Sequence, residues 1–413
     1  MIDPRLLRED PEAIRQSLRR RGSKIDLDAL IGIEAQLRSA RQEAEQLRAS
    51  QKDAGREIAG LEGEAKEAAI AGVAELAARV KEAADTVDRL EEDFHRVLVE
   101  VPNLVAPDAA DGYTEEDNLE VKRVGEPRTE GIDHATLGDR LGIIDTMRGA
   151  KVSGSRFGYL KGQGAMLEFS LVRWAMDHLV AAGFTPMVPP VLVREEALTG
   201  TGFFPEAREQ VYEIPRDELF LVGTAEVPLA AYHTDEILEE VPLRYAGFST
   251  CFRREAGTYG KDTAGIFRVH QFDKVEMFVF TAAEDSAAEH DRLLAVEEKL
   301  VGELEIPYRV VNVAAGDLGA SAAKKYDIEA WFPGEQNYRE VTSCSNTTDY
   351  QARRLKVRMK TERGNEVVHT LNGTACAVGR TILALIENHQ QPDGTVVIPE
   401  ALRRYTGFDV IES

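Results

Sequence analysis

Cysteines and long apolar runs are both scarce in this sequence. Only three cysteines occur among 413 residues, and no run reaches the roughly 18 apolar residues that a membrane-spanning helix needs. Cys251, Cys344 and Cys376 are too far apart for a CxxC metal or redox site, and their odd number fits reduced thiols. The charged segment from Met1 to Arg21 also lacks the apolar core of a signal peptide. We therefore expect a cytoplasmic protein without a membrane anchor.

Basic residues are outnumbered by acidic ones. The chain has 50 Lys and Arg against 72 Asp and Glu, a net charge of −22. This balance argues against general binding to polyanions, so any nucleic-acid contact must come from a local basic patch. With 43% hydrophobic and 30% charged residues the composition is that of a globular protein, and the length suits two or three domains.

Common nucleotide and hydrolase motifs are absent as well. The sequence has no Walker lysine loop, no GxGxxG after a strand, no HExxH and no GxSxG, so arginines would have to hold any bound ATP. The densest cluster of candidates is Phe252-Arg253-Arg254-Glu255, a loop with glycines at 257, 260 and 265 and Lys261, and then Arg268 to Glu276.

Strand periodicity suggests how this cluster is arranged. Alternation puts Arg253 and Glu255 on one face, and it likewise groups Phe272, Lys274 and Glu276. An arginine can donate two parallel hydrogen bonds to a carboxylate or phosphate, and a glutamate can accept a hydrogen bond from an amine. For Arg253 and Glu255 taken alone, a cross-strand salt bridge is the simpler explanation.

The N-terminal part carries heptad repeats. The first run has two registers, Leu30, Leu37, Ala44, Ile58, Ala65 and Ile33, Ala40, Leu47, Ala54, Leu61, with a break only at Gln51. A second run follows Gly72: Leu76, Val80, Ala83, Val87, Leu90, Phe94, Val97 and Val101. Glycines at 60, 63 and 72 place the reversal between the runs. We predict an antiparallel coiled-coil arm over about 26–100, roughly 50 Å long at ~1.5 Å per residue.

One flank of this arm is basic. Its cations are Arg38, Arg41, Arg48, Lys52 and Arg56, interrupted by Glu45. Such a flank can follow a nucleic-acid backbone, although taken alone it is more often a solvated face with salt bridges.

The remaining sequence mixes helices and strands without regular alternation. A linker is expected over about 101–130, and the predicted elements after it are helices over 163–181, 286–304 and 376–388, an extended segment over 184–193, and strands over 243–252, 267–280, 308–313 and 366–371. This order favours an α+β fold with a largely antiparallel sheet flanked by helices over a doubly wound fold.

With these motifs in place, the sequence resembles the bacterial-type seryl-tRNA synthetases, which are class II aminoacyl-tRNA synthetases, over nearly its whole length. The matching stretches are GFTPMVPPVLV at 183–193, LVGTAEVPLAAYH at 221–233, STCFRREAGTYGKDTAGIFRVHQFDKVE at 249–276, YREVTSCSN at 338–346 and LNGTACAVGRT at 371–381. The FRRE run and the last arginine are shared by many class II enzymes. The TAE run, the EVTSCSN run and the arm are more specific to the seryl branch, although Thr374 stands where serine is common.

The resemblance implies roles for the matching residues. ATP would be bound by Arg253, Glu255, Arg268, Phe272, Glu340, Val341, Thr342, Ser343 and Arg380, of which Arg253 and Arg380 would be catalytic. L-Serine would be bound by Thr224, Ala225, Glu226, Arg253, Glu276 and Thr374. Glu340 and Ser343 would ligate Mg²⁺, and the basic flank of the arm would contact tRNA.

The implied enzyme activates L-serine with ATP to seryl-adenylate and transfers serine to the 3′ end of tRNA(Ser). The resemblance also implies a tRNA-binding domain over 1–110, a catalytic domain over 111–413, and a homodimer whose interface includes the region from Gln163 to Val193. Two alternatives are a synthetase-like paralogue that loads another acceptor and a non-enzymatic coiled-coil nucleic-acid-binding protein. The arm opposes the first, and Arg253, Glu276, Glu340 and Arg380 oppose the second. Singly, each site residue has a structural explanation, such as a helix cap for Thr224.

Overall fold

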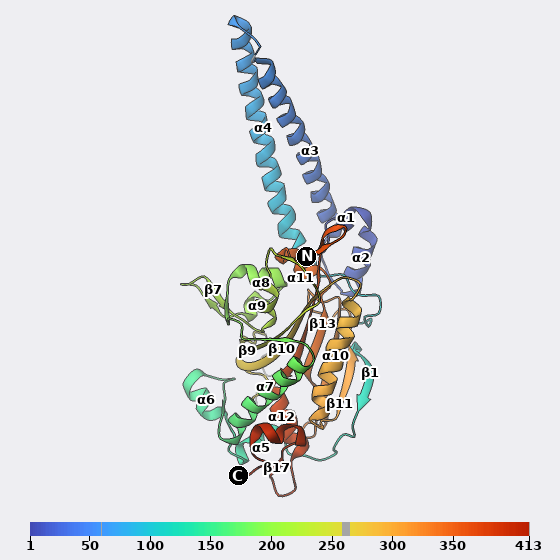
Figure 1. Cartoon of the computed structure of the whole chain (residues 1–413), viewed down its shortest axis with the longest axis vertical. Helices are drawn as coiled ribbons and strands as arrows, with labels where there is room; N and C mark the ends of the chain where they lie inside the picture. Colours follow the sequence, from blue (N-terminus) through green and yellow to red (C-terminus); the bar gives the residue numbers. More distant parts are fainter. Residues whose placement is uncertain (59, 258–264, 413) are drawn as a thin grey trace. The chain divides into compact units, whose positions relative to one another are not determined.

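The computed structural model describes residues 1–58, 60–257 and 265–412 (Figure 1). The chain divides into two compact units. One comprises Ile2–Arg19 and Ser23–Pro102, and the other comprises Met1, Arg20–Gly22 and Asn103–Ser413. None of the helices in the described part of the chain combines the length and apolar character needed to cross a membrane.

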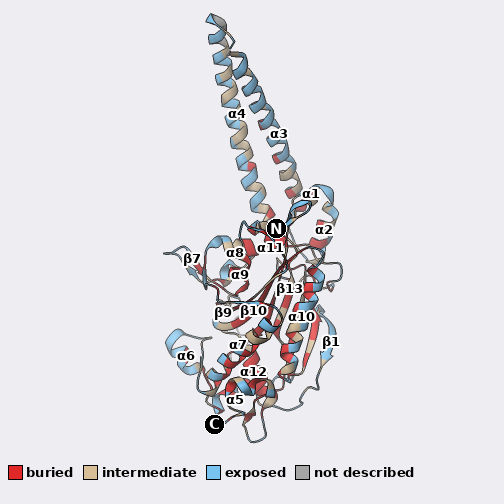
Figure 2. Ribbon diagram, in the orientation of Figure 1, coloured by how far each residue is buried: buried red, intermediate tan, exposed pale blue. Residues whose placement is uncertain are grey.

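The N-terminal unit contains the predicted arm. Its helices are α1 (Leu6–Glu9), α2 (Pro11–Arg20), α3 (Leu27–Ile58) and α4 (Gly63–Leu98). The pair α3 and α4 runs antiparallel, and its seam buries heptad side chains that include Leu30, Leu37 and Ala44 on α3 and Leu90 on α4. Most other residues of the two helices are exposed or half-buried (Figure 2). A coiled-coil arm was therefore a correct prediction.

The predicted position of the reversal was wrong in part. Helix α4 begins at Gly63, so Gly72 lies inside it, and Leu61 and Ala65 do not belong to the first helix. Gly63 has a φ of +63°, a conformation that glycine adopts at little cost. A Cβ on Gly72 would meet no atom within 4 Å, so that glycine requires no break in the helix.

The larger unit is built on an eight-stranded sheet. Its order is β1 (Leu119–Val124), β11 (Tyr308–Asn312), β12 (Lys324–Phe332), β13 (Asn337–Asn346), β16 (His369–Ala377), β10 (Gln271–Thr281), β9 (Leu243–Phe252) and β4 (Thr185–Met187). Neighbouring strands are antiparallel except for β4 and β9. This confirms the α+β prediction.

Four helices cover one face of this sheet. They are α5 (His134–Arg140), α7 (Gln163–Ala181), α10 (Ser286–Glu303) and α12 (Val378–His389). Val275, Met277 and Val279 of β10 share one buried core with helix residues such as Trp174 and Leu383. Alternation therefore turns the even-numbered residues of β10 to the other face, which is where the site lies.

Smaller elements complete the unit. The short helices are α6 (Thr146–Ser153), α8 (Glu195–Thr201), α9 (Glu226–Ala231), α11 (Tyr350–Leu355), α13 (Glu400–Thr406), η1 (Glu115–Asp117) and η2 (Arg208–Gln210). The small sheets contain β2 (Ile144–Asp145) with β3 (Tyr159–Leu160), β5 (Leu192–Val193), β7 (Leu219–Leu221) and β6 (Glu213–Ile214), β15 (Gly364–Val367), β14 (Arg358–Thr361) and β8 (Ile237–Leu238), and β17 (Val396–Val397) with β18 (Val410–Ile411).

One predicted strand and the predicted linker need correction. The expected strand over 366–371 is divided between two sheets, because Val367 pairs with Arg358 of β14 whereas His369 pairs with Thr281 of β10. The expected linker over 101–130 contains β1, the outermost strand of the main sheet. Nearly all of its residues are exposed, so it lacks the alternation of a half-buried strand.

Candidate active site

Two β-bulges determine which side chains reach the site. Between β12 and β13, Ile328 pairs with Thr342 but Glu329 pairs with Glu340, so Val341 is an extra residue. Glu340 and Ser343 are three residues apart, and ordinary alternation would separate them. With the bulge, they oppose Glu329 and Asp327, which share a face. The bulge therefore brings both predicted magnesium ligands to one side of the sheet.

A second bulge does the same for β16. Val275 pairs with Cys376 and Glu276 pairs with Thr374, which leaves Ala375 as the extra residue. Thr374 consequently opposes Glu276, on the face away from α7, α10 and α12.

A pocket on this face gathers every residue that was predicted to bind ATP. Its lining comprises Arg253, Glu255, Arg268, Phe272, Glu340, Val341, Thr342, Ser343 and Arg380, together with Thr374 and the residues Ile266, Phe267, Val269, Lys274, Ala377 and Gly379. Residues from three strands (β10, β13 and β16), the segment after β9, the segment around Phe267 and the start of α12 therefore meet in one place.

Acids and aromatic rings hold the guanidinium groups in this pocket. Arg268 Nη1 donates to Glu255 Oε2 at 2.8 Å, and Arg253 Cζ lies 5.1 Å from the centre of the Phe272 ring. Arg380 Nη1 donates to the Glu340 carbonyl at 2.9 Å and to its Oε2 at 3.2 Å, and its Cζ lies 4.8 Å from the Phe267 ring. Guanidinium groups restrained in this way suit a polyanionic ligand.

Arg253 and Glu255 reach the pocket by a different route from the predicted one. Strand β9 ends at Phe252, so strand alternation does not place them. Arg253 N donates to the His270 carbonyl at 3.0 Å, and Glu255 has a φ of +49° in a turn. Both side chains line the pocket. Gly260 and Lys261 of the predicted loop lie outside the described residues.

Glu340 is a carboxylate at neutral pH. Burial alone would raise its pKa, but the charges of Lys325 and Arg380 lower the pKa of Glu340 to about 2. Lys325 Nζ lies 3.7 Å from Glu340 Oε1 and 2.9 Å from Asp327 Oδ1. Among the described residues, no set of three or more His, Cys, Asp and Glu side chains is grouped to hold a metal ion.

The predicted serine-binding residues form a second, more buried cluster. Thr224 lies in the turn between β7 and α9, and its Oγ1 donates to Glu276 Oε2 at 3.1 Å. Glu276 is 2% exposed and also pairs with Lys274. Arg253 Nε donates to the Gly223 carbonyl at 3.1 Å, which places this arginine between the two clusters. Ala225 is fully buried, and its neighbour Glu226 begins α9.

Three residues of this cluster, Gln351, Asn372 and Lys274, were not given a role from the sequence. Glu226 Oε1 accepts from Gln351 Nε2 at 2.7 Å and from Asn372 Nδ2 at 3.0 Å, and Lys274 pairs with Glu276. Burial, followed by repulsion from Glu276, raises the pKa of Glu226 to about 7. Asn372 stands inside the LNGT run, which was the available signal, whereas Gln351 lies outside the matching stretches.

The basic flank of the arm belongs to the other unit. All five of its side chains are exposed on α3. Arg41 pairs with Glu91 at 2.8 Å, Arg56 pairs with Asp53 at 3.3 Å, and Arg38 lies 4.0 Å from Glu34. The structure therefore combines solvent-exposed cations, including Arg48 and Lys52, with local salt bridges.

Comparisons with known proteins agree with this geometry. Residues 1–105 match the seryl-tRNA synthetase N-terminal domain, and residues 211–389 match the tRNA synthetase class II core domain (G, H, P, S and T). The serine–tRNA ligase of Acidothermus cellulolyticus is 53% identical, with 100% of this chain and 99% of that protein covered. The ligase of Thermobifida fusca is 51% identical over the same shares.

A solved structure is similar over its whole length as well. The seryl-tRNA synthetase from Pyrococcus horikoshii, crystallised with ATP, superposes with a TM-score of 0.96 at 41% identity and covers 100% of this chain and 99% of its own. These matches confirm the resemblance inferred from the sequence motifs. The chain belongs to the seryl-tRNA synthetase family, the serine–tRNA ligases among the class II aminoacyl-tRNA synthetases.

Proposed function

We propose that this chain activates L-serine with ATP and Mg²⁺, releasing pyrophosphate, and then transfers the seryl group from the adenylate to the 3′ end of tRNA(Ser). The observation that carries the proposal is the position of Arg253. This arginine lines the arginine-rich pocket and also donates a hydrogen bond to the Gly223 carbonyl beside the buried acidic cluster. One guanidinium can therefore contact the two groups that must react.

In the activation step, a serine carboxylate oxygen forms a bond to the α-phosphorus while the bond between that phosphorus and the pyrophosphate oxygen breaks. Negative charge grows on the α-phosphate oxygens as the bond forms. Arg253 would bind both the carboxylate and the α-phosphate, and Arg268 and Arg380 would hold the outer phosphates. Phe272 would stack on adenine, and Glu255 would accept a hydrogen bond from the adenine amino group. Catalysis then consists mainly of positioning and charge stabilisation.

The buried acidic cluster would select serine. Thr224, Glu226 and Glu276 would surround the substrate ammonium, and Thr374 with Glu276 would bond to its hydroxyl. The high pKa of Glu226 reflects burial and repulsion by Glu276, and an incoming ammonium would offset that repulsion. Alanine would leave these groups without a partner, an effect that can discriminate on the order of 10⁴-fold.

The residues at the bulge of β13 fit Mg²⁺. Glu340 supplies an ionised carboxylate and Ser343 supplies a hydroxyl on the same face, and such oxygen donors suit a hard cation that keeps several waters. When bound, the cation would neutralise phosphate charge.

We propose two partners for the chain, tRNA(Ser) and a second copy of itself, in the reducing cytoplasm. The exposed cations of α3 support tRNA binding, because they offer phosphate contacts on a protein that is acidic as a whole. Exposed apolar side chains of α6 and α7, such as Met147 and Phe169, support a homodimer.

Exchange of pyrophosphate into ATP tests the first half-reaction. We expect exchange that depends on L-serine and on Mg²⁺, with alanine and threonine as controls that give little signal. Charging of total tRNA with labelled serine tests the second half-reaction, and sequencing of the charged fraction identifies the acceptor. Exchange without charging would instead favour the paralogue that loads a different acceptor.

A further inference from the structure

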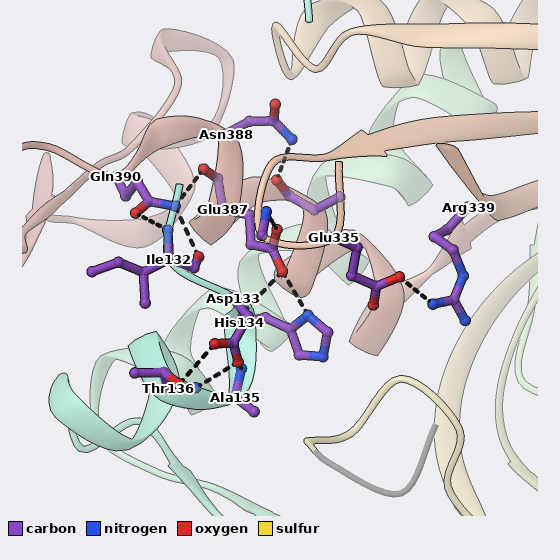
Figure 3. Close-up of polar contacts among 12 residues, drawn as sticks. Ile132, Asp133, His134, Ala135, Thr136, Glu335, Arg339, Glu387, Asn388 and Gln390 are labelled. Carbon is purple, nitrogen blue, oxygen red and sulfur yellow. Dashed lines mark hydrogen bonds and ion pairs between the residues drawn. The ribbon is translucent and has the colours of Figure 1, made fainter. Parts of the chain in front are cut away.

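A buried histidine–glutamate pair lies beside the ATP pocket without lining it. Glu387, near the end of α12, is 0% exposed, and His134, the first residue of α5, is 5% exposed. Glu387 Oε1 lies 2.7 Å from His134 Nδ1 and accepts from His134 N at 2.8 Å, as Figure 3 shows. Its Oε2 accepts from Gly334 N at 2.7 Å. Both carboxylate oxygens are thus used in fixing neighbouring segments.

The end of α12 holds two segments of chain with this and similar contacts. Gln390 Oε1 accepts from Ile132 N at 2.8 Å, and Asn388 Nδ2 donates to the Trp331 carbonyl at 2.8 Å (Figure 3). The two segments also touch, since a Cβ on Gly334 would lie 2.4 Å from Asp133 Cα. The backbone on both sides of His134 is therefore closely restrained.

The imidazole of His134 packs against the wall of the ATP pocket. A Cβ on Gly265 would lie 2.8 Å from His134 Cδ2 and 2.9 Å from its Nε2, so the backbone at Gly265 approaches the ring edge closely. Gly265 also has a φ of +69°, which favours glycine. Two residues later, the Phe267 ring lies 6.4 Å from the His134 ring. Ile266, Phe267 and Arg268 all line the pocket.

The ring of Phe267, whose position depends on the His134 contact, packs against two arginines. Arg339 Cζ lies 4.0 Å and Arg380 Cζ lies 4.8 Å from the centre of its ring. Arg380 and Glu387 are both on α12, and their separation of about two turns places them on nearly the same face. Glu387 therefore contacts His134, His134 packs near Phe267, and Phe267 packs against Arg380. Since Arg380 and Glu387 are on the same helix, these contacts link α12 to itself through the wall of the pocket.

We propose that His134 and Glu387 are a positioning pair for ATP, which fixes Gly265 and Phe267 and thereby the guanidinium of Arg380. This proposal rests on the proposed function, because it takes Arg380 as a phosphate ligand. Neither residue of the pair lines the pocket, so neither is a catalytic residue. The pair acts on the nucleotide side of the site, and serine binding does not depend on it.

His134→Asn provides the first test. Asparagine keeps a donor near the position of Nδ1 for Glu387 but removes the ring edge that supports Gly265. We expect KM for ATP in pyrophosphate exchange to rise by about tenfold, because a small displacement of a phosphate ligand weakens nucleotide binding. KM for serine should stay within about twofold of that of the unchanged protein. A residue with a merely structural role would lower the active fraction, and hence kcat, without separating the two KM values.

Gly265→Ala disturbs the same contact from the other side and leaves the buried pair intact, so it carries the test if His134→Asn fails to fold. The added methyl group would press on the His134 ring, and the same selective rise in KM for ATP is expected. Glu387→Gln removes one acceptor and should show the effect as well.

Glu303→Gln is the matched control. It alters another histidine–glutamate contact, His178 Nε2 to Glu303 Oε2 at 2.8 Å, which joins α7 to α10 away from the pocket lining. Its KM for ATP should not change. If the three test variants fold and their KM for ATP stays within about twofold of the control, the positioning role is wrong. If the unchanged protein performs no exchange, the proposed function fails and this inference fails with it.

Discussion

Arg253 connects the two clusters of the candidate site. Its guanidinium donates a hydrogen bond to the Gly223 carbonyl and lies over the Phe272 ring, so the arginine side chain is restrained before any substrate binds. We predict that Arg253→Ala keeps the fold but lowers the rate of pyrophosphate exchange by roughly 10²-fold or more, because one donor to the developing charge is lost. Circular dichroism checks the fold. Exchange within a few-fold of the original rate would reduce Arg253 to a structural role.

A second prediction concerns how Glu168 makes the stability of the protein depend on pH. It lies on α7 beside Asp273, and burial, with a hydrogen bond and repulsion from Asp273, raises the pKa of Glu168 from 4.5 to about 7. The folded state therefore binds the proton more tightly than the unfolded state does, and the free energy of unfolding falls as pH rises through this interval. Glu168→Gln removes this titration, so its stability relative to the original protein should increase between pH 5 and pH 7.

Thermal unfolding at several pH values measures this difference. Asp177→Asn on the same helix is the control, because a hydrogen bond from Arg173 already lowers the pKa of Asp177. Its contribution to stability is fully present above the ordinary value of 3.8 and stays constant from pH 5 to pH 7. A Glu168→Gln protein whose relative stability does not change with pH would contradict the raised pKa of Glu168.

The residues that sequence reasoning did not assign are those that depend on long-range contacts. Asn372 and Gln351 meet Glu226 across 146 and 125 positions of the chain. Each could equally have been a surface amide on the sequence alone. The residues that we propose to bind ATP were easier to assign, because their runs keep the order and spacing of a known family.

At the scale of elements, periodicity predicted regular segments and missed irregular ones. The expected bounds of α7 and β9 match the structure, because α7 is periodic and β9 is a continuous, half-buried strand. Strand β13 was not predicted, although it carries the EVTSCSN run. Its bulge at Val341 interrupts the alternation that identifies a strand. The irregularity that hides the strand also brings Glu340 and Ser343 to one face, so the proposed Mg²⁺ site and the missed strand have one physical cause.

The arm illustrates the same limit for helices. Heptads identified both helices, since the apolar seam is a local pattern that repeats over many turns. They did not identify the turn, because glycine at 72 is compatible with a solvent-exposed helix and glycine at 63 is not followed by a visible change of pattern. The existence of both helices was therefore predictable, whereas the reversal was located only to within the segment 60–72.

For the whole molecule, we predict a homodimer. Met147, Val152 and Phe169 are at least 67% exposed, which is unusual for large apolar side chains that have no partner. Phe169→Glu should therefore give a monomer by light scattering at micromolar protein, whereas the original protein should have twice the mass. Ile70→Glu, at a position 51% exposed on α4, is the control and should leave the mass unchanged. A stable, active monomer of the original protein would disprove the assembly.

Deletion of Asp28 to Glu100 with a short connecting linker tests whether the two half-reactions separate. The arm has its own apolar seam, and all described residues of the ATP pocket lie after position 250, so exchange should survive. Charging of tRNA should be lost, because the deletion removes the phosphate contacts that we propose for Arg48, Lys52 and their neighbours. A full-length Arg48→Glu, Lys52→Glu protein should show a smaller loss and a shallower salt dependence, by about one unit of slope per contact removed. Equal charging by the deleted and full-length proteins would make the arm a structural element, and loss of exchange would mean that the catalytic core needs the arm in order to fold.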